Sequence, residues 1–378
     1  MTEETKHPAK SAAQWTTLSG RECNILRGIA IMGIMLHNYC HWLSSIVKEN
    51  EFTYKVQNVR WFAELMKKPL GEVEHLFFHL FSYFGHYGVP IFLFLSAYGL
   101  VRKYENTPSV DGQETTYDCI AFVKYHWLKL FRMMIFGFAA FVLLDTITPA
   151  PHRYQVIDII AQMGLVNNLL PTPDKVIWPG PYWFFGLMLQ LYVAYRFVLY
   201  RKDWKWIVGA MLLCTIMQSV VAPESEELNY IRYNFIGGIA PFGLGLLYAK
   251  YGKALSKKYY CFLMIPAFCF VFFADASFLT WLLNPLFVCV AFISLTKVAQ
   301  LLPTGTALWF TWLPSLLNWI GTVSAAIFVC HPITRKIIIP ISREGDYWAG
   351  LILYVITTMC LAWCFHQFMK HLPSPKMK

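Results

Sequence analysis

The sequence predicts an all-α protein that crosses a membrane about ten times. Of its 378 residues, 57% are hydrophobic and only 14% are charged, whereas a soluble protein carries nearer a quarter charged residues. The apolar residues also form long runs instead of an amphipathic pattern. We therefore expect a polytopic membrane protein, and we do not interpret the net charge of +10 as a nucleic-acid-binding surface.

Each hydrophobic run is long enough, or nearly so, to span a hydrocarbon core of about 30 Å. The runs lie at 25–46, 78–101, 128–148, 181–200, 204–222, 233–249, 259–274, 278–296, 316–338 and 348–369.

The segments between the runs alternate in charge. Basic residues follow every second run, as at Arg201 and Lys202 after the fourth, whereas the segment 223–227 after the fifth is acidic. The positive-inside bias then places both termini in the cytoplasm and makes the chain a multi-pass protein of the cell (cytoplasmic or inner) membrane. Two long segments on the outer side, 47–77 and 149–180, are placed to cover a substrate entrance.

No internal repeat or linker divides the hydrophobic part of the chain. We expect one transmembrane domain over 21–370, between a polar cytoplasmic tail at 1–20 and a short one at 371–378. The tail 1–20 lacks the apolar core of a signal peptide, so the first transmembrane helix is expected to direct targeting.

The first run contains the strongest candidate for chemistry. It starts at Arg27 and includes His37 and His41, which are four residues apart and share a helix face. At about 1.5 Å per residue, His37 lies roughly 15 Å beyond Arg27, near the middle of the bilayer. Ionisable groups at that depth are costly and usually face a cavity, and imidazole suits a general base near neutral pH. His331, in the ninth run, is a third intramembrane histidine.

Three basic residues near the cytoplasmic ends of helices form a second candidate group. Lys129 and Arg132 are three residues apart on one helix face, and together with Arg27 they could clamp a polyanion such as a nucleotide phosphate. Positive-inside anchoring is the alternative explanation for all three.

Aromatic residues open the fourth run on the outer side. Tyr182 and Trp183 are typical of an interfacial aromatic belt, whereas Gln190, about two turns further in, is an amide that needs a partner in hydrocarbon. The cysteines lie mostly in apolar runs and show no CxxC or Cys/His spacing, so no metal site is predicted.

Together these segments resemble the acyltransferase 3 family of integral-membrane acyltransferases over nearly the whole chain. The similarity lies in the order and spacing of several segments: Leu26-Arg27-Gly28-Ile29-Ala30 leading to His37, Gly85 to Tyr98, the KxxR pair Lys129/Arg132 where the family has RxxR, Tyr182 to Phe185, Phe242 to Gly245, and Trp319 to His331.

The chain departs from the family at one position. The family commonly has ten residues between its first-helix arginine and the key histidine, and here Asn38 occupies that position. On an ideal helix His37 points about 100° away from that position, and His41 points only about 40° away from Arg27. Local unwinding at Gly28 and Gly33 would realign His37, which we favour from its place in the motif, with His41 as the rival.

The resemblance implies an acyltransferase 3 fold and transfer of an acyl group, most often acetyl, from cytoplasmic acyl-CoA to a hydroxyl of a glycan or lipid-linked sugar, as in polysaccharide O-acetylation. It implies His37 or His41 as the base, CoA phosphates at Arg27, Lys129 and Arg132, and no permanently bound cofactor. Asn38, Tyr182, Trp183, Gln190 and His331 are the expected acceptor-side residues. The alternatives are a proton-coupled secondary transporter using the intramembrane histidines, or a non-catalytic scaffold. The sequence does not define the acyl chain, the acceptor or the oligomeric state.

Overall fold

The computed structural model describes residues 18–105, 118–300 and 309–377. These ranges contain helices and no strand, so the all-α prediction is confirmed. Seven helical segments in them are long and apolar enough to cross a membrane, which makes the chain a multi-pass membrane protein. Most of the predicted tail 1–20 lies outside the described residues.

All ten hydrophobic runs lie on helices. The helices are α1 (Gly20–Cys40), α2 (Val56–Met66), α3 (Leu76–Phe84), α4 (Gly88–Tyr104), α5 (Cys119–Ile147), α6 (Val156–Gly164), α7 (Pro173–Val176), α8 (Trp183–Ala194), α9 (Trp204–Ser219), α10 (Glu226–Tyr233), α11 (Phe235–Tyr251), α12 (Lys257–Phe273), α13 (Phe278–Gln300), α14 (Trp309–Glu344) and α15 (Tyr347–His371). Short 3₁₀ turns lie at η2 (Leu70–Glu72), η3 (Gly85–Tyr87), η4 (Asn167–Leu169), η5 (Gly180–Tyr182) and η7 (Ala274–Ala276), and a π-helical turn, η6, covers Tyr195–Leu199.

Three of the expected spans are not among the seven segments. They are α1, which carries Arg27, His37 and Asn38, and the shorter helices α9 and α11, of 16 and 17 residues. The expected span at 25–46 was wrong at its end, because α1 stops at Cys40 and turns lead to Ser45, whose φ is positive at 57°.

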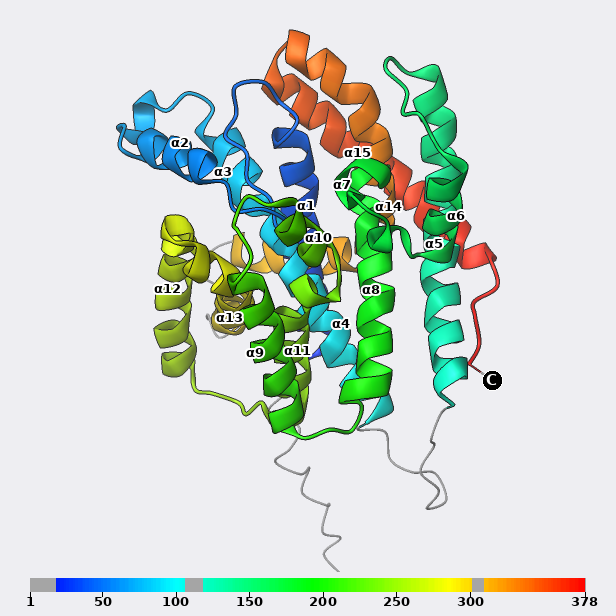
Figure 1. The fold of residues 1–378 in the computed structure, drawn as a ribbon. Helices are drawn as coiled ribbons and strands as arrows, with labels where there is room; N and C mark the ends of the chain where they lie inside the picture. Colours follow the sequence, from blue (N-terminus) through cyan, green and yellow to red (C-terminus); the bar gives the residue numbers. More distant parts are fainter. Residues whose placement is uncertain (1–17, 106–117, 301–308, 378) are drawn as a thin grey trace, which may run out of the picture.

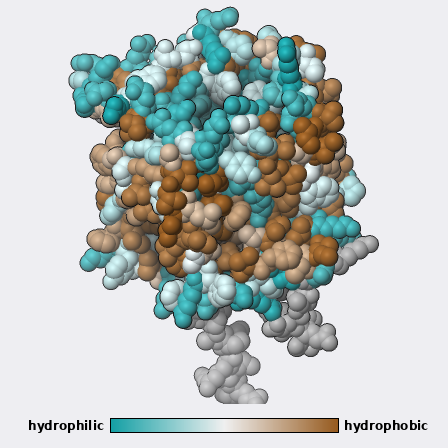
Figure 2. All heavy atoms as spheres, viewed as in Figure 1, coloured by the Kyte–Doolittle hydropathy of each residue, from teal (hydrophilic) through white to brown (hydrophobic). Residues whose placement is uncertain are grey.

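The long helices run between two ends of the molecule. In Figure 1 the connection between α8 and α9 lies at the lower end, whereas α2 and the connection between α14 and α15 lie at the upper end. Figure 2 shows hydrophobic side chains gathered over the middle of this face and hydrophilic ones towards both ends. This distribution is the one expected for a protein surrounded by lipid at its middle.

Helix α1 is the central element, and it makes its most extensive contacts with α14 and also packs on α3, η3 and α4. It is one continuous α-helix, so the unwinding expected at Gly28 and Gly33 does not occur. Both glycines instead permit close packing, because a Cβ at Gly28 would clash with the Leu317 carbonyl and one at Gly33 would lie 3.1 Å from the Gly85 carbonyl oxygen.

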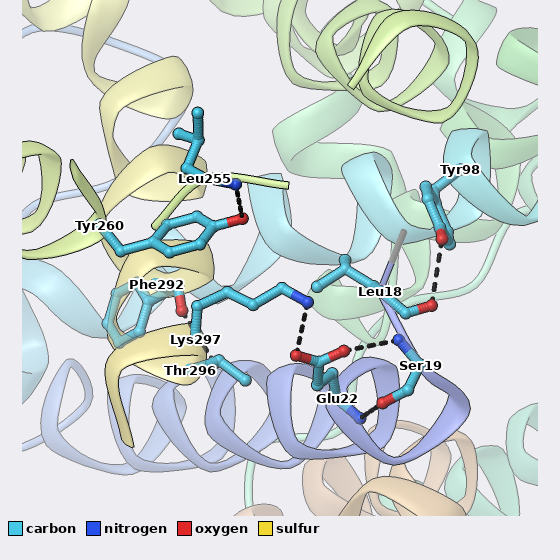
Figure 3. Close-up of polar contacts among 9 residues, drawn as sticks. All are labelled: Leu18, Ser19, Glu22, Tyr98, Leu255, Tyr260, Phe292, Thr296 and Lys297. Carbon is cyan, nitrogen blue, oxygen red and sulfur yellow. Dashed lines mark hydrogen bonds and ion pairs between the residues drawn. The ribbon is translucent and has the colours of Figure 1, made fainter. Parts of the chain in front are cut away.

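The start of α1 is fixed by a capping box and an ion pair (Figure 3). The Ser19 hydroxyl accepts a hydrogen bond from the Glu22 backbone N–H at 3.2 Å, and the Glu22 carboxylate accepts one from the Ser19 N–H at 2.6 Å. The same carboxylate lies 2.7 Å from Lys297 Nζ on α13. These contacts hold the first turn of α1 in place, and through the rigid helix they also fix the position of its other end, which carries the histidines.

Candidate active site

Three histidines cluster at the C-terminal end of α1. The ring centroids of His37 and His41, one helical turn apart, are 4.9 Å apart, and the His86 ring from η3 lies 5.3 Å from that of His37. All three line one cavity. The structure therefore brings together the two histidines between which the sequence left the choice of base open, and adds a third.

His86 reaches His37 because a glycine precedes it. A Cβ at Gly85 would lie 2.6 Å from the Gly33 carbonyl oxygen and 2.7 Å from the His37 Cβ, distances that real Cβ atoms essentially never show. The backbone of η3 therefore lies directly against α1 at the level of His37. Any side chain at this position would separate the two rings.

The imidazoles are buried and have few protein partners. His37 is 8% exposed and His86 is 2% exposed. The Nδ1 atoms of His37 and His41 and both ring nitrogens of His86 lack a hydrogen-bond partner within the part of the chain that the structure describes. Buried polar groups normally have partners, so exceptions in a cavity wall are candidates for contact with a substrate.

Asn38, which stands where the family has its histidine, binds an arginine. Its Oδ1 accepts a hydrogen bond of 2.7 Å from Arg335 Nη1 on α14, and its Nδ2 donates to the Ile34 carbonyl at 3.0 Å. The Arg335 guanidinium also lies over the Trp42 ring, 4.9 Å from its centroid. Asn38, Trp42 and Arg335 all line the same cavity as the histidines.

The cavity has a volume of about 1060 Å³. Residues of 47–77 and 149–180, with residues of α10, line it, and that these segments cover a substrate entrance stays a prediction. Aromatic rings and carboxylates face it: Trp42, Phe52, Trp178, Trp183, Phe184, Tyr233 and Phe328, with Glu51, Asp174, Glu224, Glu226 and Glu227.

One wall of the cavity, the segment 49–54, is tied to α13 and η7. Trp281 Nε1 donates to Glu49 Oε1 at 3.1 Å, and the Tyr54 hydroxyl donates to the Asp275 carbonyl at 2.7 Å. Next to them, Arg232 donates to the Glu51 carbonyl oxygen. Burial raises the pKa of the Glu51 carboxyl to about 7, against the opposing effects of a backbone hydrogen bond and of Arg232.

The other residues predicted on the acceptor side divide into two groups. Trp183 lines the cavity. Tyr182, Gln190 and His331 do not line it and make structural contacts instead. The Tyr182 hydroxyl donates to the Val329 carbonyl at 3.0 Å, Gln190 binds Asn234 Oδ1 at 2.8 Å, and His331 Nδ1 lies 3.2 Å from the Ile327 carbonyl.

The three basic residues predicted to bind CoA are not joined by any hydrogen bond or ion pair in the described ranges. Arg27 donates to Asn24 Oδ1 at 3.0 Å, and Lys129 is exposed. Arg132 donates to the carbonyls of Met369 and Leu372, the latter at 2.8 Å, at the end of α15. In this structure Arg132 therefore stabilises a helix C-terminus.

Sequence reasoning missed two residues of the site. His86 lies inside the segment Gly85 to Tyr98, which resembles the family. That segment was used only for the resemblance, and His86 was not considered as a site residue. Arg335 lies inside the ninth apolar run, where an ionisable residue is itself a signal of function, and only His331 was taken from that run. In the described ranges, no group of three or more His, Cys, Asp or Glu side chains is arranged to hold a metal ion.

The comparisons with known proteins identify the family of the chain. A family model described as an acyltransferase domain matches residues 21–367, nearly the whole chain. No curated protein and no solved structure matches significantly. With this match and several apolar helices, the chain is a multi-pass membrane acyltransferase that belongs to the acyltransferase 3 family.

Proposed function

We propose that the protein transfers an acyl group, most often acetyl in this family, from cytoplasmic acyl-CoA to a hydroxyl of a glycan or lipid-linked sugar. The observation that carries the proposal is the histidine cluster in the wall of a large cavity bounded by outer segments. An acceptor hydroxyl that enters this cavity meets buried imidazoles. The corresponding location is the cell membrane, with both termini in the cytoplasm and surface polysaccharide as the modified material.

In the proposed step His37 is the general base. Its neutral imidazole takes the proton of the acceptor hydroxyl while the oxygen attacks the thioester carbonyl carbon and the C=O electron pair moves to oxygen. When the carbonyl re-forms, the C–S bond breaks and the imidazolium returns the proton to the CoA sulfur. The products are the ester and free CoA, so the base is regenerated.

The donor is proposed to reach this site from the cytoplasmic side. Arg27 lies ten residues before His37, roughly 15 Å along α1, and would hold CoA phosphates with Lys129 and Arg132 while the pantetheine arm extends towards the histidines. Arg132 also holds the end of α15, so a phosphate contact would compete with the carbonyls of Met369 and Leu372.

The lining of the cavity suits a sugar. Aromatic rings such as Trp178 and Trp183 offer faces for stacking against the apolar faces of pyranose rings, and carboxylates such as Asp174 accept hydrogen bonds from hydroxyls. The large aromatic share of the lining supports a glycan over a small acceptor such as water.

The test is to compare acyl transfer by His37→Ala, His41→Ala and His86→Ala at matched membrane levels, with CoA affinity measured in parallel. A general base contributes about 10²–10⁴-fold, so we expect a loss of that order in His37→Ala, unchanged donor affinity, and a milder loss in the other two. His366→Ala is the matched control, since this histidine of α15 does not line the cavity. Near-normal turnover in His37→Ala with a dead His41→Ala would assign the base to His41.

Acyl-CoA binding and hydrolysis by the purified protein separate this proposal from a proton-coupled transporter, which the family assignment does not favour. Mass analysis of surface glycans with and without the protein would identify the acceptor and the acyl chain.

A further inference from the structure

Arg335 is a buried cation without a carboxylate partner. Its side chain is 5% exposed, and in the described ranges it forms no ion pair with Asp or Glu. Its protein contacts are the 2.7 Å hydrogen bond to Asn38 Oδ1 and the stacking over Trp42. A buried charge is costly unless it is paired, so this guanidinium needs an explanation.

Other cations of the helices show that the fold ordinarily supplies a partner. Lys336, the next residue, lies 2.8 Å from the Asp145 carboxylate. Lys297 lies 2.7 Å from Glu22, and Lys250 lies 2.6 Å from Glu105. Arg232, also buried, donates to the Glu51 carbonyl and to Gln218 Oε1. Arg335 differs from all of them in facing the cavity with one acceptor for its five N–H groups.

Charge is distributed unevenly around the cavity. The lining residues from α1 and α14 include Arg335 and no acid, whereas all the lining carboxylates come from Glu51, from α7 and from the segment 224–227 that leads into α10. Arg335 is therefore the cation on the wall formed by α1 and α14, whereas the acids and Lys55 stand on the other walls. A polyanion would be repelled by the acids, but a sugar with one anionic group could place that group at Arg335 and its hydroxyls towards the carboxylates.

The immediate surroundings hold the guanidinium in one orientation. Asn38 accepts a hydrogen bond from Nη1, and the guanidinium carbon lies over the Trp42 ring. The remaining N–H groups form a planar fork, the geometry that matches a carboxylate or phosphate through two parallel hydrogen bonds. Because Asn38 is adjacent to His37, an anion bound here would hold the rest of the acceptor next to the histidine cluster.

We propose that Arg335, oriented by Asn38 and Trp42, binds a carboxylate or phosphate of the acceptor, so that the acceptor is a sugar with one anionic group. This inference rests on the proposed function, because it places the acceptor in the histidine-lined cavity. It concerns recognition and not the transfer step. Binding experiments therefore test it even if the assignment of the base is wrong.

The experiment measures binding of D-glucuronate, D-glucose 6-phosphate and uncharged D-glucose to the purified full-length protein by calorimetry. We expect a charged sugar to bind about ten- to a hundredfold more tightly than glucose, the range of one charge-assisted contact. A preference for glucuronate or for the phosphate sugar tells which anion the site takes. In Arg335→Gln the preference should disappear while glucose affinity stays, and in Arg335→Lys part of it should remain.

Arg343→Gln is the matched control. Its guanidinium lies 6.0 Å from the same Trp42 ring and donates to the Trp42 carbonyl, but it does not line the cavity, so the preference should persist. Thermal unfolding of each variant shows whether it is folded. The proposal is wrong if neither charged sugar binds more tightly than glucose to the wild type, or if Arg335→Gln and Arg335→Lys both keep the full preference. It is also wrong if Arg335→Gln lowers only the rate of transfer with sugar preference unchanged, since the guanidinium would then act on the thioester.

Discussion

Replacement of Gly85 by alanine should disturb the site through packing alone. The backbone of Gly85 is in the right-handed helical region, with φ −65°, so alanine fits there without backbone strain. Its Cβ, however, would lie 2.6 Å from the Gly33 carbonyl oxygen and 2.7 Å from the His37 Cβ. Ordinary contact begins at 3.4 Å, so η3 and α1 would have to separate by 3.4 − 2.6 = 0.8 Å. Neither neighbour is the end of a flexible side chain that could turn away.

Gly99→Ala is the matched control for this change. Gly99 lies on the same helical segment, Leu76–Tyr104, and a Cβ there meets nothing within 4 Å. Both substitutions gain up to about 1 kcal/mol from the higher helix propensity of alanine, so this term cancels between them. The difference in the free energy of unfolding then measures the clash, and overpacking of this kind costs about 1–3 kcal/mol.

The assay is equilibrium unfolding of both variants in mixed micelles, followed by acyl transfer at matched protein levels. We expect Gly85→Ala to be less stable than Gly99→Ala by about 1–3 kcal/mol. Because a misplacement of about 1 Å can cost 10²-fold in rate, transfer by Gly85→Ala should fall far more than its folded fraction. Equal unfolding free energies in the two variants would refute the close contact between η3 and α1.

Three further predictions follow from other parts of the chain. Arg132→Ala should weaken acyl-CoA binding by about 1.5–3 kcal/mol if Arg132 holds a phosphate. If Arg132→Ala and Lys129→Ala both bind acyl-CoA like the wild type, and only Arg132→Ala is less stable, Arg132 acts only as the cap of α15. A cysteine at Ser225, in a background without other reactive cysteines, should react with an impermeant maleimide added from the non-cytoplasmic side, and reaction only from the cytoplasm would invert the topology. The pKa of Glu51 is raised to about 7 from an ordinary value of about 4.3, so between these pH values the unfolded state loses a proton that the folded state keeps, and stability falls as pH rises. Glu51→Gln should remove that part of the decline, and parallel thermal midpoints of both proteins from pH 5 to 8 would contradict the assignment.

The helices were predictable from the sequence, whereas the partners of polar residues were not. Hydrophobic runs report local burial in lipid, and all ten became helices. The meeting of Asn38 with Arg335 joins residues 297 apart in the chain, and no local pattern contains that information. The same limit applies to Gln190. The sequence showed that this amide needs a partner, but not that the partner is Asn234, which lies on another segment and outside the cavity.

Ideal helical geometry led to a choice between His37 and His41 that the structure does not impose. Both line the cavity, because they are one turn apart and the cavity extends along that turn. The angle from Arg27 was therefore the wrong criterion, since nothing requires a base and a phosphate-binding residue to lie on one line along α1. Which histidine acts as the base stays a prediction.

The attachment of the segment 49–54 has a consequence for how acceptors exchange. Swinging this wall outward would break the Glu49–Trp281 and Tyr54–Asp275 hydrogen bonds and the stacking of Phe52 on Tyr233, whose ring centroids are 3.8 Å apart. These contacts hold this wall of the cavity in place. We therefore expect the enzyme to select acceptors by their cross-section, so that the end of a linear chain binds and a branch point does not. We also expect the turnover rate to depend on the diffusion of that chain end and not on the opening of a lid.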